Sequence, residues 1–209
     1  MVKHIGETSY KETAFGIIPR SRLIHLEIEG IRRAWDFVVQ ERAKGILPMT
    51  PAFIRRLHKV GFGWIFPKIG GSYRKIEVTV SHHTPPKHYL VPALMIGFTA
   101  DIKVRMKHLP RIDSAHFLDE LVTLLAWTHH RFSWIHPFAD YNGRIGRLLN
   151  SVILLNLHLP PIELKVETIS GRKKYIRALQ RADEYDYADL EKIIREAIEE
   201  SVQELSSHK

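Results

Sequence analysis

Residues 136–147, with the sequence HPFADYNGRIGR, carry side chains that could together process a phosphate compound. The imidazole of His136 can accept a proton from an attacking hydroxyl group near neutral pH. Asp140 supplies a hard carboxylate, the usual magnesium ligand beside a polyphosphate. If the segment also binds phosphates, a base and a metal ligand so close together indicate a site for phosphoryl or nucleotidyl transfer.

The second half of this segment could bind the phosphates. Asn142 and Gly143 predict a tight turn whose N–H groups, with the start of the following helix, form an anion site. Arg144 and Arg147 lie three residues apart, so they share one face of the first helical turn. Each feature alone is common in ordinary turns and helix ends. Their joint occurrence directly before the apolar run 148–159 favours the functional interpretation.

Helices must position this segment, because apolar residues recur at helical spacing through most of the chain. Gly30 interrupts the first pattern and predicts a weak point or a junction of two shorter helices. Residues 75–80 alternate polar and apolar and predict the one strand region, so the fold should be mainly α with one small β-hairpin. Helices are expected over residues 22–44, 50–60, 91–108, 114–132, 144–158, 172–183 and 188–205, of which 144–158 should be the buried central helix.

Length and composition fit one globular domain with a short, loosely ordered N-terminal segment. The chain has 209 residues, of which 44% are hydrophobic, and no apolar run reaches the roughly 18 residues that span a bilayer. The first residues lack the apolar core of a signal peptide. The absence of cysteine excludes disulfides and thiolate chemistry, and we expect a cytoplasmic protein without membrane partners.

The net charge of +8 raises the question of nucleic-acid binding. The basic residues are spread along the chain, however, which is typical of a soluble basic surface with a preference for phosphate-bearing or acidic partners. The 13 histidines show no zinc-enzyme spacing on a predicted helix. We therefore do not expect a nucleic-acid-binding protein or a zinc site.

The segment 136–147 resembles the signature of the Fic family (filamentation induced by cyclic AMP), His-Pro-Phe-x-Asp/Glu-Gly-Asn-Gly-Arg-x-x-Arg. Eight of its nine specified positions match. The resemblance implies a helical core with a β-hairpin flap. It also implies transfer of AMP from Mg-ATP to a hydroxyl side chain of a target protein.

Carried onto this sequence, the resemblance gives each residue of the signature a function. His136 would deprotonate a Ser, Thr or Tyr of the target, Phe138 would anchor the loop in the core, and Asp140 would hold Mg²⁺. The hydroxyl would attack the α-phosphate in line, and pyrophosphate would leave. The phosphates would be bound by the backbone of Asn142 and Gly143 and by the side chains of Arg144 and Arg147.

Tyr141 departs from the pattern, because the family has glycine, or sometimes alanine, at this position. Glycine adopts positive φ at little cost and lets the backbone approach a phosphate. Tyrosine adds strain if φ is positive, and bulk beside the phosphates. Either the loop tolerates the ring turned outward, or nucleotide binding is altered.

Further segments resemble the flap and the adenine side of the family. Residues 71–74 and the alternating stretch after them look like the flap, which docks the target peptide by strand addition, although an ordinary exposed hairpin is the alternative. Tyr185 stands where relatives often have glycine. The flap residues would be Tyr73, Ile76, Val78 and Val80, and the residues near adenine would be Tyr175 and Asp183.

An inhibitory element is expected upstream of the signature. Glu29-Gly30 resembles the family's inhibitory Ser/Thr-x-x-x-Glu-Gly/Asn, with His25 in place of Ser/Thr. Glu29 would pair with Arg147 and block the γ-phosphate site; otherwise it is a solvated charge on a helix. The expected division is a loosely ordered segment 1–20, an inhibitory region 21–45 and a Fic core 46–209.

Three alternatives to adenylyl transfer stay open from the sequence. The site could move another phosphate-linked group or remove AMP from a modified target. The protein could instead be a non-catalytic nucleotide- or protein-binding module, because of Tyr141. A basic nucleic-acid-binding regulator is the most distant hypothesis, and a homodimer that restrains the inhibitory helix is also left open.

Overall fold

The computed structural model describes residues 10–80, 83–166 and 168–207, and the fold that these residues form is mainly helical. They form α-helices, a 3₁₀ turn at His88–Leu90 and one two-stranded antiparallel sheet. The fold class expected from the sequence is thus confirmed. The elements are β1 (Tyr10–Thr13), β2 (Gly16–Pro19), α1 (Arg20–Ala43), α2 (Pro51–Phe62), α3 (Val91–Lys107), α4 (Phe117–Ile135), α5 (Asn142–Asn156), α6 (Ile169–Asp183) and α7 (Ala188–Ser207).

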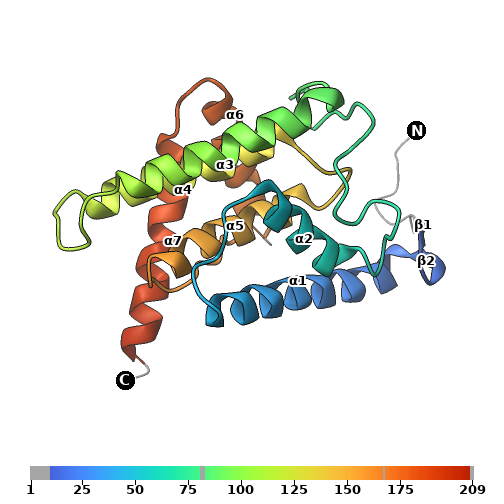
Figure 1. Cartoon of the computed structure of the whole chain (residues 1–209), viewed down its shortest axis with the longest axis horizontal. Helices are drawn as coiled ribbons and strands as arrows, with labels where there is room; N and C mark the ends of the chain where they lie inside the picture. Colours follow the sequence, from blue (N-terminus) through green and yellow to red (C-terminus); the bar gives the residue numbers. More distant parts are fainter. Residues whose placement is uncertain (1–9, 81–82, 167, 208–209) are drawn as a thin grey trace.

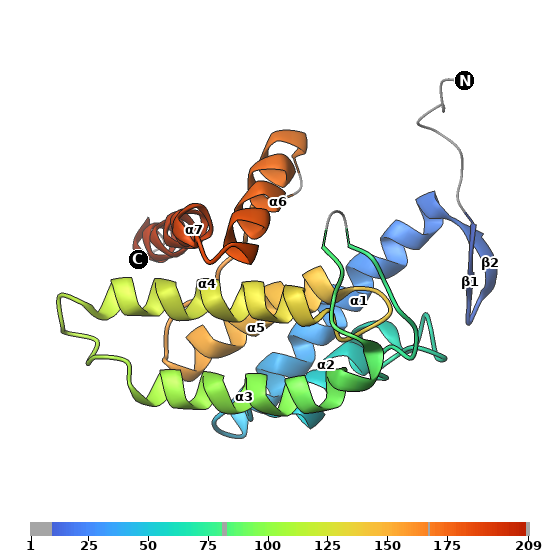
Figure 2. The ribbon, with the colours of Figure 1, turned by 90° about the horizontal axis from the view of Figure 1, so that it is seen from above.

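The helices surround α5, and Figures 1 and 2 show α3 and α4 on one side of it and α1 and α2 on the other. Helix α7 crosses α4, and α6 leads into α7. The β1–β2 hairpin lies at the end of the molecule where α1 begins. The segment between α4 and α5 lies at the end of these helices that is nearer the β1–β2 hairpin.

The central helix α5 is buried, as its apolar sequence predicts. Ile145, Leu149, Val152 and Ile153 have no exposed surface. A helix that is apolar nearly all round must be covered on several sides. The start of α5 is therefore fixed by the whole core, not by one neighbour.

Helix α1 runs through Gly30 without a break, so the expected junction there is wrong. Gly30 instead lies against Gly61 of α2, where a Cβ atom would come within 2.5 Å of the Gly61 carbonyl oxygen. Glycine has a lower helix propensity than alanine, but only glycine lets the two helices pack this closely.

The β-structure lies elsewhere than expected. Residues 75–80 form no regular strand; the described part of this loop makes single bridges, from Tyr73 to Phe138 and from Val80 to His83. Figure 2 shows the two limbs of this loop rising beside each other. The sheet forms instead in residues 10–19, where Gly16 supplies a positive φ of 85° at the turn. The expectation of loose order over residues 1–20 is therefore wrong for 10–19, and residues 1–9 lie outside the described residues.

Helix starts follow local capping chemistry. The Thr50 side chain accepts a hydrogen bond from the Phe53 N–H at 3.2 Å and Pro51 occupies the first turn, as predicted. Ser114 does not cap α4, whose N-cap is His116. Helix α6 begins at Ile169, three residues earlier than expected, because Thr168 caps it.

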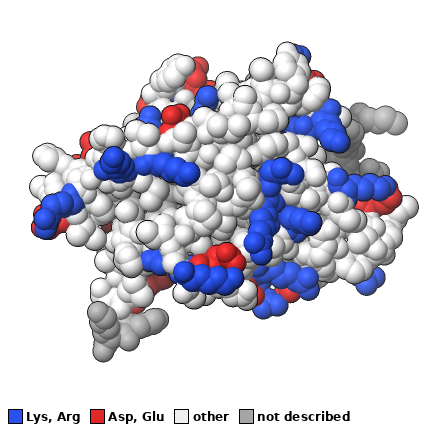
Figure 3. All heavy atoms as spheres, viewed as in Figure 1, with Lys and Arg blue, Asp and Glu red and all other residues white. Residues whose placement is uncertain are grey.

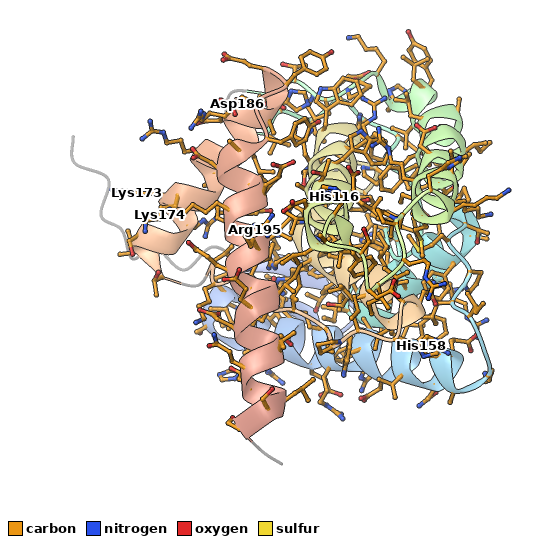
Figure 4. The ribbon with its side chains drawn as sticks, turned by 90° about the vertical axis from the view of Figure 1, so that its left-hand side faces the viewer. His116, His158, Lys173, Lys174, Asp186 and Arg195 are labelled. Atoms are coloured by element: carbon orange, nitrogen blue, oxygen red, sulfur yellow. The ribbon has the colours of Figure 1, made fainter. Side chains whose placement is uncertain are left out.

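Charged pairs connect the C-terminal helices to each other and to α4. Arg195 of α7 contacts Asp119 of α4 at 2.6 Å, and Arg181 of α6 pairs with Asp186 and Asp189. Figure 4 shows Asp186 where α7 begins and Arg195 further along that helix. The Arg181 pairs connect α6, which lines the site described below, to the start of α7.

The surface charge agrees with the dispersed basic residues of the sequence. Figure 3 shows Lys and Arg side chains scattered over one face, several of them beside acidic groups, without one continuous patch. Within the described ranges, none of the helices is both long enough and apolar enough to cross a membrane.

Candidate functional site

The loop between α4 and α5 is closed by its own residues. His136 ends α4 in the left-handed region, with φ 48°, and its N–H donates to the Phe132 carbonyl at 3.0 Å. The Asn142 carboxamide accepts from the Phe138 N–H at 2.9 Å and donates to the Phe138 carbonyl at 2.8 Å. The Phe138 ring is fully buried, as the resemblance implied. The loop therefore has one defined shape.

The polar residues of the signature meet at a cavity of about 450 Å³ at the start of α5. This cavity also brings in residues from β1 and α1 that the sequence did not single out. We call it the phosphate cavity. Its lining is Lys11, Arg20, Glu27, His136, Asp140, Tyr141, Asn142, Gly143, Arg144 and Arg147.

A larger cavity, of about 870 Å³, shares six lining residues with the phosphate cavity and adds the inner face of α6. Tyr175 and Asp183, expected near adenine, both line it, and so does Val80 of the expected flap. We call it the α6 cavity. The two cavities together offer room for a polyphosphate at one end and a base at the other.

His136 is held neutral at the junction of the two cavities. Burial lowers the pKa of His136 to about 4, an effect to which the charge of Arg74 adds and which the Ser133 backbone and Asp140 partly offset. Arg74 is itself buried, and its Nε donates to the His136 carbonyl at 2.8 Å. Near neutral pH the imidazole can therefore accept a proton, and Arg74 fixes the backbone that carries it.

His58 of α2 packs against the loop and forms a hydrogen bond with its backbone. One ring nitrogen is 3.2 Å from the Asp140 carbonyl oxygen and the other accepts from the Gly71 N–H at 3.0 Å, so Nε2 carries the proton. The ring stacks on Phe138 with 3.9 Å between centroids. Burial lowers the pKa of His58 to about 4. Nothing in the spacing of His58 indicated this function, because it depends on the packing of α2.

Glu27, which the sequence did not single out, is the glutamate that reaches the phosphate cavity. Its side chain is 1% exposed; one oxygen lies 2.7 Å from Arg144 and the other 2.7 Å from Arg20. The helical spacing of the sequence indicates that Glu27 faces inward. Leu23, Gly30 and Ala34 mark the inner face of α1, and Glu27 falls on that face. Arg144 and Arg20 stabilise this buried carboxylate at the wall of the phosphate cavity.

Glu29 does not make the expected pair with Arg147. Its carboxylate bonds Arg32 at 2.8 Å and Arg33 at 2.9 Å on the same helix. Those arginines lower its pKa to about 2. Two residues after Glu27, a side chain on an α-helix points about 200° away from it. Glu29 therefore faces away from the site, and this expectation is corrected in favour of Glu27.

The Tyr141 ring is turned inward, contrary to the outward position considered from the sequence. Its backbone has φ 64°, as the glycine in the family pattern indicated. The ring stacks on Phe62 with centroids 4.0 Å apart, and its hydroxyl donates to Glu27 at 2.9 Å. Burial and the charge of Glu27 raise the pKa of Tyr141 above its ordinary value. The ring thus leaves the cavity open and adds a donor to Glu27.

Two histidines of α4 hold the expected adenine-side residues. His129 Nε2 lies 2.6 Å from the Tyr175 hydroxyl, and both side chains are buried. His130 Nε2 donates to Asp183 at 2.9 Å. Burial lowers the pKa of His129 to about 3 and that of His130 below its usual range. Tyr175 is therefore a packed wall of the α6 cavity, whereas Asp183 presents a partly exposed carboxylate to it.

The four expected flap residues lie at different depths. Tyr73 is half-buried and its backbone bridges to Phe138, which ties the loop to the signature. Ile76 is 62% exposed. Val78 and Val80 are half-buried, and Val80 lines the α6 cavity. The structure brings Tyr73 and Val80 to the site and leaves Ile76 at the surface.

Lys11 of β1 brings the N-terminal hairpin to Asp140. Its Nζ donates to Asp140 Oδ2 at 2.7 Å, and the other carboxylate oxygen accepts from the Tyr141 N–H at 2.8 Å. Asp140 is one of the cavity residues, so the hairpin covers one side of the phosphate cavity. The sequence gave no sign of this contact, because it joins positions 129 residues apart.

A family model described as the Fic/DOC family matches residues 48–154, which include α2 to most of α5 and all of the signature. The chain belongs to the Fic/DOC family. It is 28% identical over 194 residues to the protein adenylyltransferase Fic of Aedes aegypti, and 28% identical over 196 residues to that of Drosophila persimilis. Each alignment covers 93% of this chain, but the chain spans only 36% of either relative.

Solved structures share the fold. Fic-1 (residues 134–508) of C. elegans superposes with a TM-score of 0.65 at 22% identity, covering 88% of this chain and 53% of that one. The N-terminal Fic domain of a Bartonella quintana protein gives 0.68 at 15% identity, covering 92% and 89%. At these identities the likeness concerns the fold, so function has to be argued from the site.

Proposed function

We propose that the protein transfers AMP from Mg-ATP to a Ser, Thr or Tyr hydroxyl of a target protein. The observation that carries the proposal is the convergence of His136, Asp140, Arg144 and Arg147 on one cavity at the start of α5. The names of the relatives from Aedes aegypti and Drosophila persimilis, protein adenylyltransferase Fic, support the same activity.

The residues of the phosphate cavity fit a nucleotide's phosphates. Helix α5 begins there, so its first N–H groups and positive dipole end favour an anion. Within the described residues, Arg144 Nη1 is buried without a hydrogen-bond partner, which leaves a donor for a phosphate oxygen. Arg147 would bind a second phosphate. The base would enter the α6 cavity beside Tyr175 and Asp183.

Asp140 fits a magnesium ion that arrives with the nucleotide. Among the described residues, no three or more His, Asp or Glu side chains form a ready metal site. Magnesium in nucleotide enzymes usually takes one or two carboxylates and completes its shell with phosphate oxygens and water. A single aspartate is thus sufficient, and the bound ion would neutralise phosphate charge.

His136 would act as the general base. The target's hydroxyl oxygen attacks the α-phosphorus while its proton passes to the neutral imidazole, and the bond from the α-phosphorus to the bridging oxygen breaks as pyrophosphate leaves. Arg144 and Arg147 would stabilise charge on the leaving group. Arg74 and His58 would position the loop through its backbone carbonyls.

The protein would be restrained by Glu27, which replaces Glu29 in this part of the proposal. The carboxylate pairs with Arg144 at 2.7 Å in the cavity where the phosphates are expected. An anion there repels a phosphate and keeps one guanidinium occupied. The inhibitory region would thus remain residues 21–45, ahead of a core at 46–209.

The target peptide would lie along the loop of Tyr73 to Val80, of which Tyr73 and Val80 approach the site.

Label transfer tests this function. Purified protein is incubated with magnesium and α-labelled ATP, with and without a cell lysate, and γ-labelled ATP serves as the comparison. We expect protein-bound label from the α position only, more of it in Glu27→Gln and none in His136→Asn. Label from the γ position would instead indicate a phosphate transferase.

A further inference from the structure

We propose that Lys11 stands in for the divalent cation at Asp140, so that the N-terminal hairpin must withdraw its lysine before the metal binds. The inference rests on the proposed function, in which Asp140 is the metal ligand. Its own basis is the contact of 2.7 Å between Lys11 Nζ and Asp140 Oδ2 at the edge of the phosphate cavity.

The hairpin that carries Lys11 is docked on the core. The Ala14 N–H donates to the Ile65 carbonyl at 2.8 Å, and Ile18 of β2 is buried. The Phe15 ring meets Trp64 edge to face with centroids 5.8 Å apart. Lys11 is thus presented to Asp140 by a packed element and is not merely a long side chain that happens to reach it.

Both oxygens of Asp140 are engaged. Oδ1 accepts from the Tyr141 N–H at 2.8 Å, which leaves Oδ2 as the oxygen for a metal, and Lys11 holds that oxygen. A magnesium–oxygen bond is about 2.1 Å long, so a bound ion would lie next to the ammonium group. Two cations on one carboxylate oxygen repel each other strongly, and the lysine must leave.

The contact is suited to reversible exchange. The Lys11 and Asp140 side chains are 41% and 43% exposed, so water can replace either partner. Ion pairs at such positions contribute little to stability and weaken with salt. Lys11 should therefore tune metal affinity by a modest factor without blocking the site permanently.

Manganese binding measures this competition directly. Free Mn²⁺ is followed by electron paramagnetic resonance in wild-type protein, Lys11→Met, Asp140→Asn and the control Lys68→Met. Lys68 also contacts the hairpin, at Glu12 with 3.3 Å, but that pair is highly exposed and does not touch the cavity. Each titration is run with and without a non-hydrolysable ATP analogue.

We expect Lys11→Met to bind Mn²⁺ about three- to tenfold more tightly than wild type, and Lys68→Met to match wild type. Unchanged or weaker Mn²⁺ binding in Lys11→Met would overturn the inference. Asp140→Asn should bind more weakly; if it binds like wild type, both the metal function of Asp140 and the inference fail. Weaker Mn²⁺ binding in Asp140→Asn combined with no change in Lys11→Met would leave the proposed function standing alone.

Hydrogen exchange supplies a second readout. Adding Mg²⁺ with the ATP analogue to wild type should speed exchange over residues 10–19, where the Ala14 amide is bonded to Ile65. Equal protection of the hairpin before and after metal–nucleotide binding would show that it does not move, contrary to the proposal.

Discussion

The Tyr141 hydroxyl donates a hydrogen bond of 2.9 Å to Glu27, across 114 residues of sequence. Tyr141 stands where the family signature has glycine, and Glu27 occupies the phosphate cavity with Arg144. The unusual residue of the signature is thus bonded to the glutamate that would restrain the protein. The Tyr141 ring does not fill the phosphate cavity, and its hydroxyl instead stabilises the Glu27 carboxylate at the cavity wall.

Removing only this hydroxyl should weaken the restraint. In Tyr141→Phe the stack on Phe62 is kept while Glu27 loses one of three partners, so we expect Mg-ATP analogue binding to tighten several-fold. The loss of a hydrogen bond to a charged group should also cost about 1.5–3 kcal/mol of stability. Calorimetry and urea unfolding measure the two effects. Tyr185→Phe, at an 89% exposed tyrosine that also has positive φ, should change neither.

His136→Asn should abolish label transfer without unfolding the protein. Asparagine tolerates the left-handed backbone of His136, which has φ 48°, but cannot accept the proton. We expect a rate loss of about 10²–10⁴-fold. His158→Asn is a matched control, since His158 also has positive φ, at 59°, and lines neither cavity. Circular dichroism should be the same for both variants. A wild-type rate in His136→Asn would show that His136 is not the general base.

The pH dependence of kcat/KM should have its acid limb well below neutrality. Because burial lowers the pKa of His136 to about 4, the base is neutral above that value, and the rate should rise with pH up to it and then level off. The rate of labelled-peptide formation is measured from pH 4 to pH 8, and tryptophan fluorescence checks that the protein stays folded at each pH. A limb near 6.5 would mean that the imidazole is solvated during turnover.

Stability should fall as the solution is acidified from pH 6.5 to pH 4. The folded state lowers the pKa of His58 to about 4, so below 6.5 the unfolded state binds more protons, and the stabilisation is lost as pH decreases. A shift of this size corresponds to roughly 3 kcal/mol. Urea unfolding at several pH values should show a shallower slope in His58→Gln. The same slope in both proteins would assign the loss to other groups.

Gly30→Ala should destabilise the protein although alanine is the better helix former. Its Cβ would lie 2.5 Å from the Gly61 carbonyl oxygen, so α1 and α2 would have to separate, at a cost of about 1–3 kcal/mol. Gly97→Ala is the opposite case, because nothing lies within 4 Å of the added methyl group in α3. There we expect a gain of about 0.5–1 kcal/mol by thermal unfolding.

Local patterns predicted the helices well, because each of the longer ones buries a continuous apolar stripe that the period of 3.6 residues reveals. The signature also predicted a loop at His136 that leads into a buried helix; the helix was expected from Arg144 and begins at Asn142, so that Asn142 and Gly143 lie in its first turn. The alternating residues 75–80 misled, since alternation indicates a strand only where a partner is available, and here the described loop makes single bridges.

The residues that surround the signature were harder to foresee. Glu27 could have been preferred to Glu29 from the inner face marked by Leu23 and Ala34. Lys11 and His58 could not have been found this way, because their contacts with Asp140 depend on how separate elements pack. Sequence patterns constrain the signature itself, whereas its surroundings follow from tertiary structure.

The close contact of Gly30 with Gly61 has a consequence for how fast the proposed restraint by Glu27 would be relieved. Helices whose backbones touch cannot separate without breaking the core, a motion of microseconds or longer. Glu27, only three residues before Gly30, can instead leave Arg144 by rotation of its own side chain. Access to the phosphate cavity would then be set by a rotamer equilibrium within an immobile helix, and a partner that changed this equilibrium would need no large movement of α1.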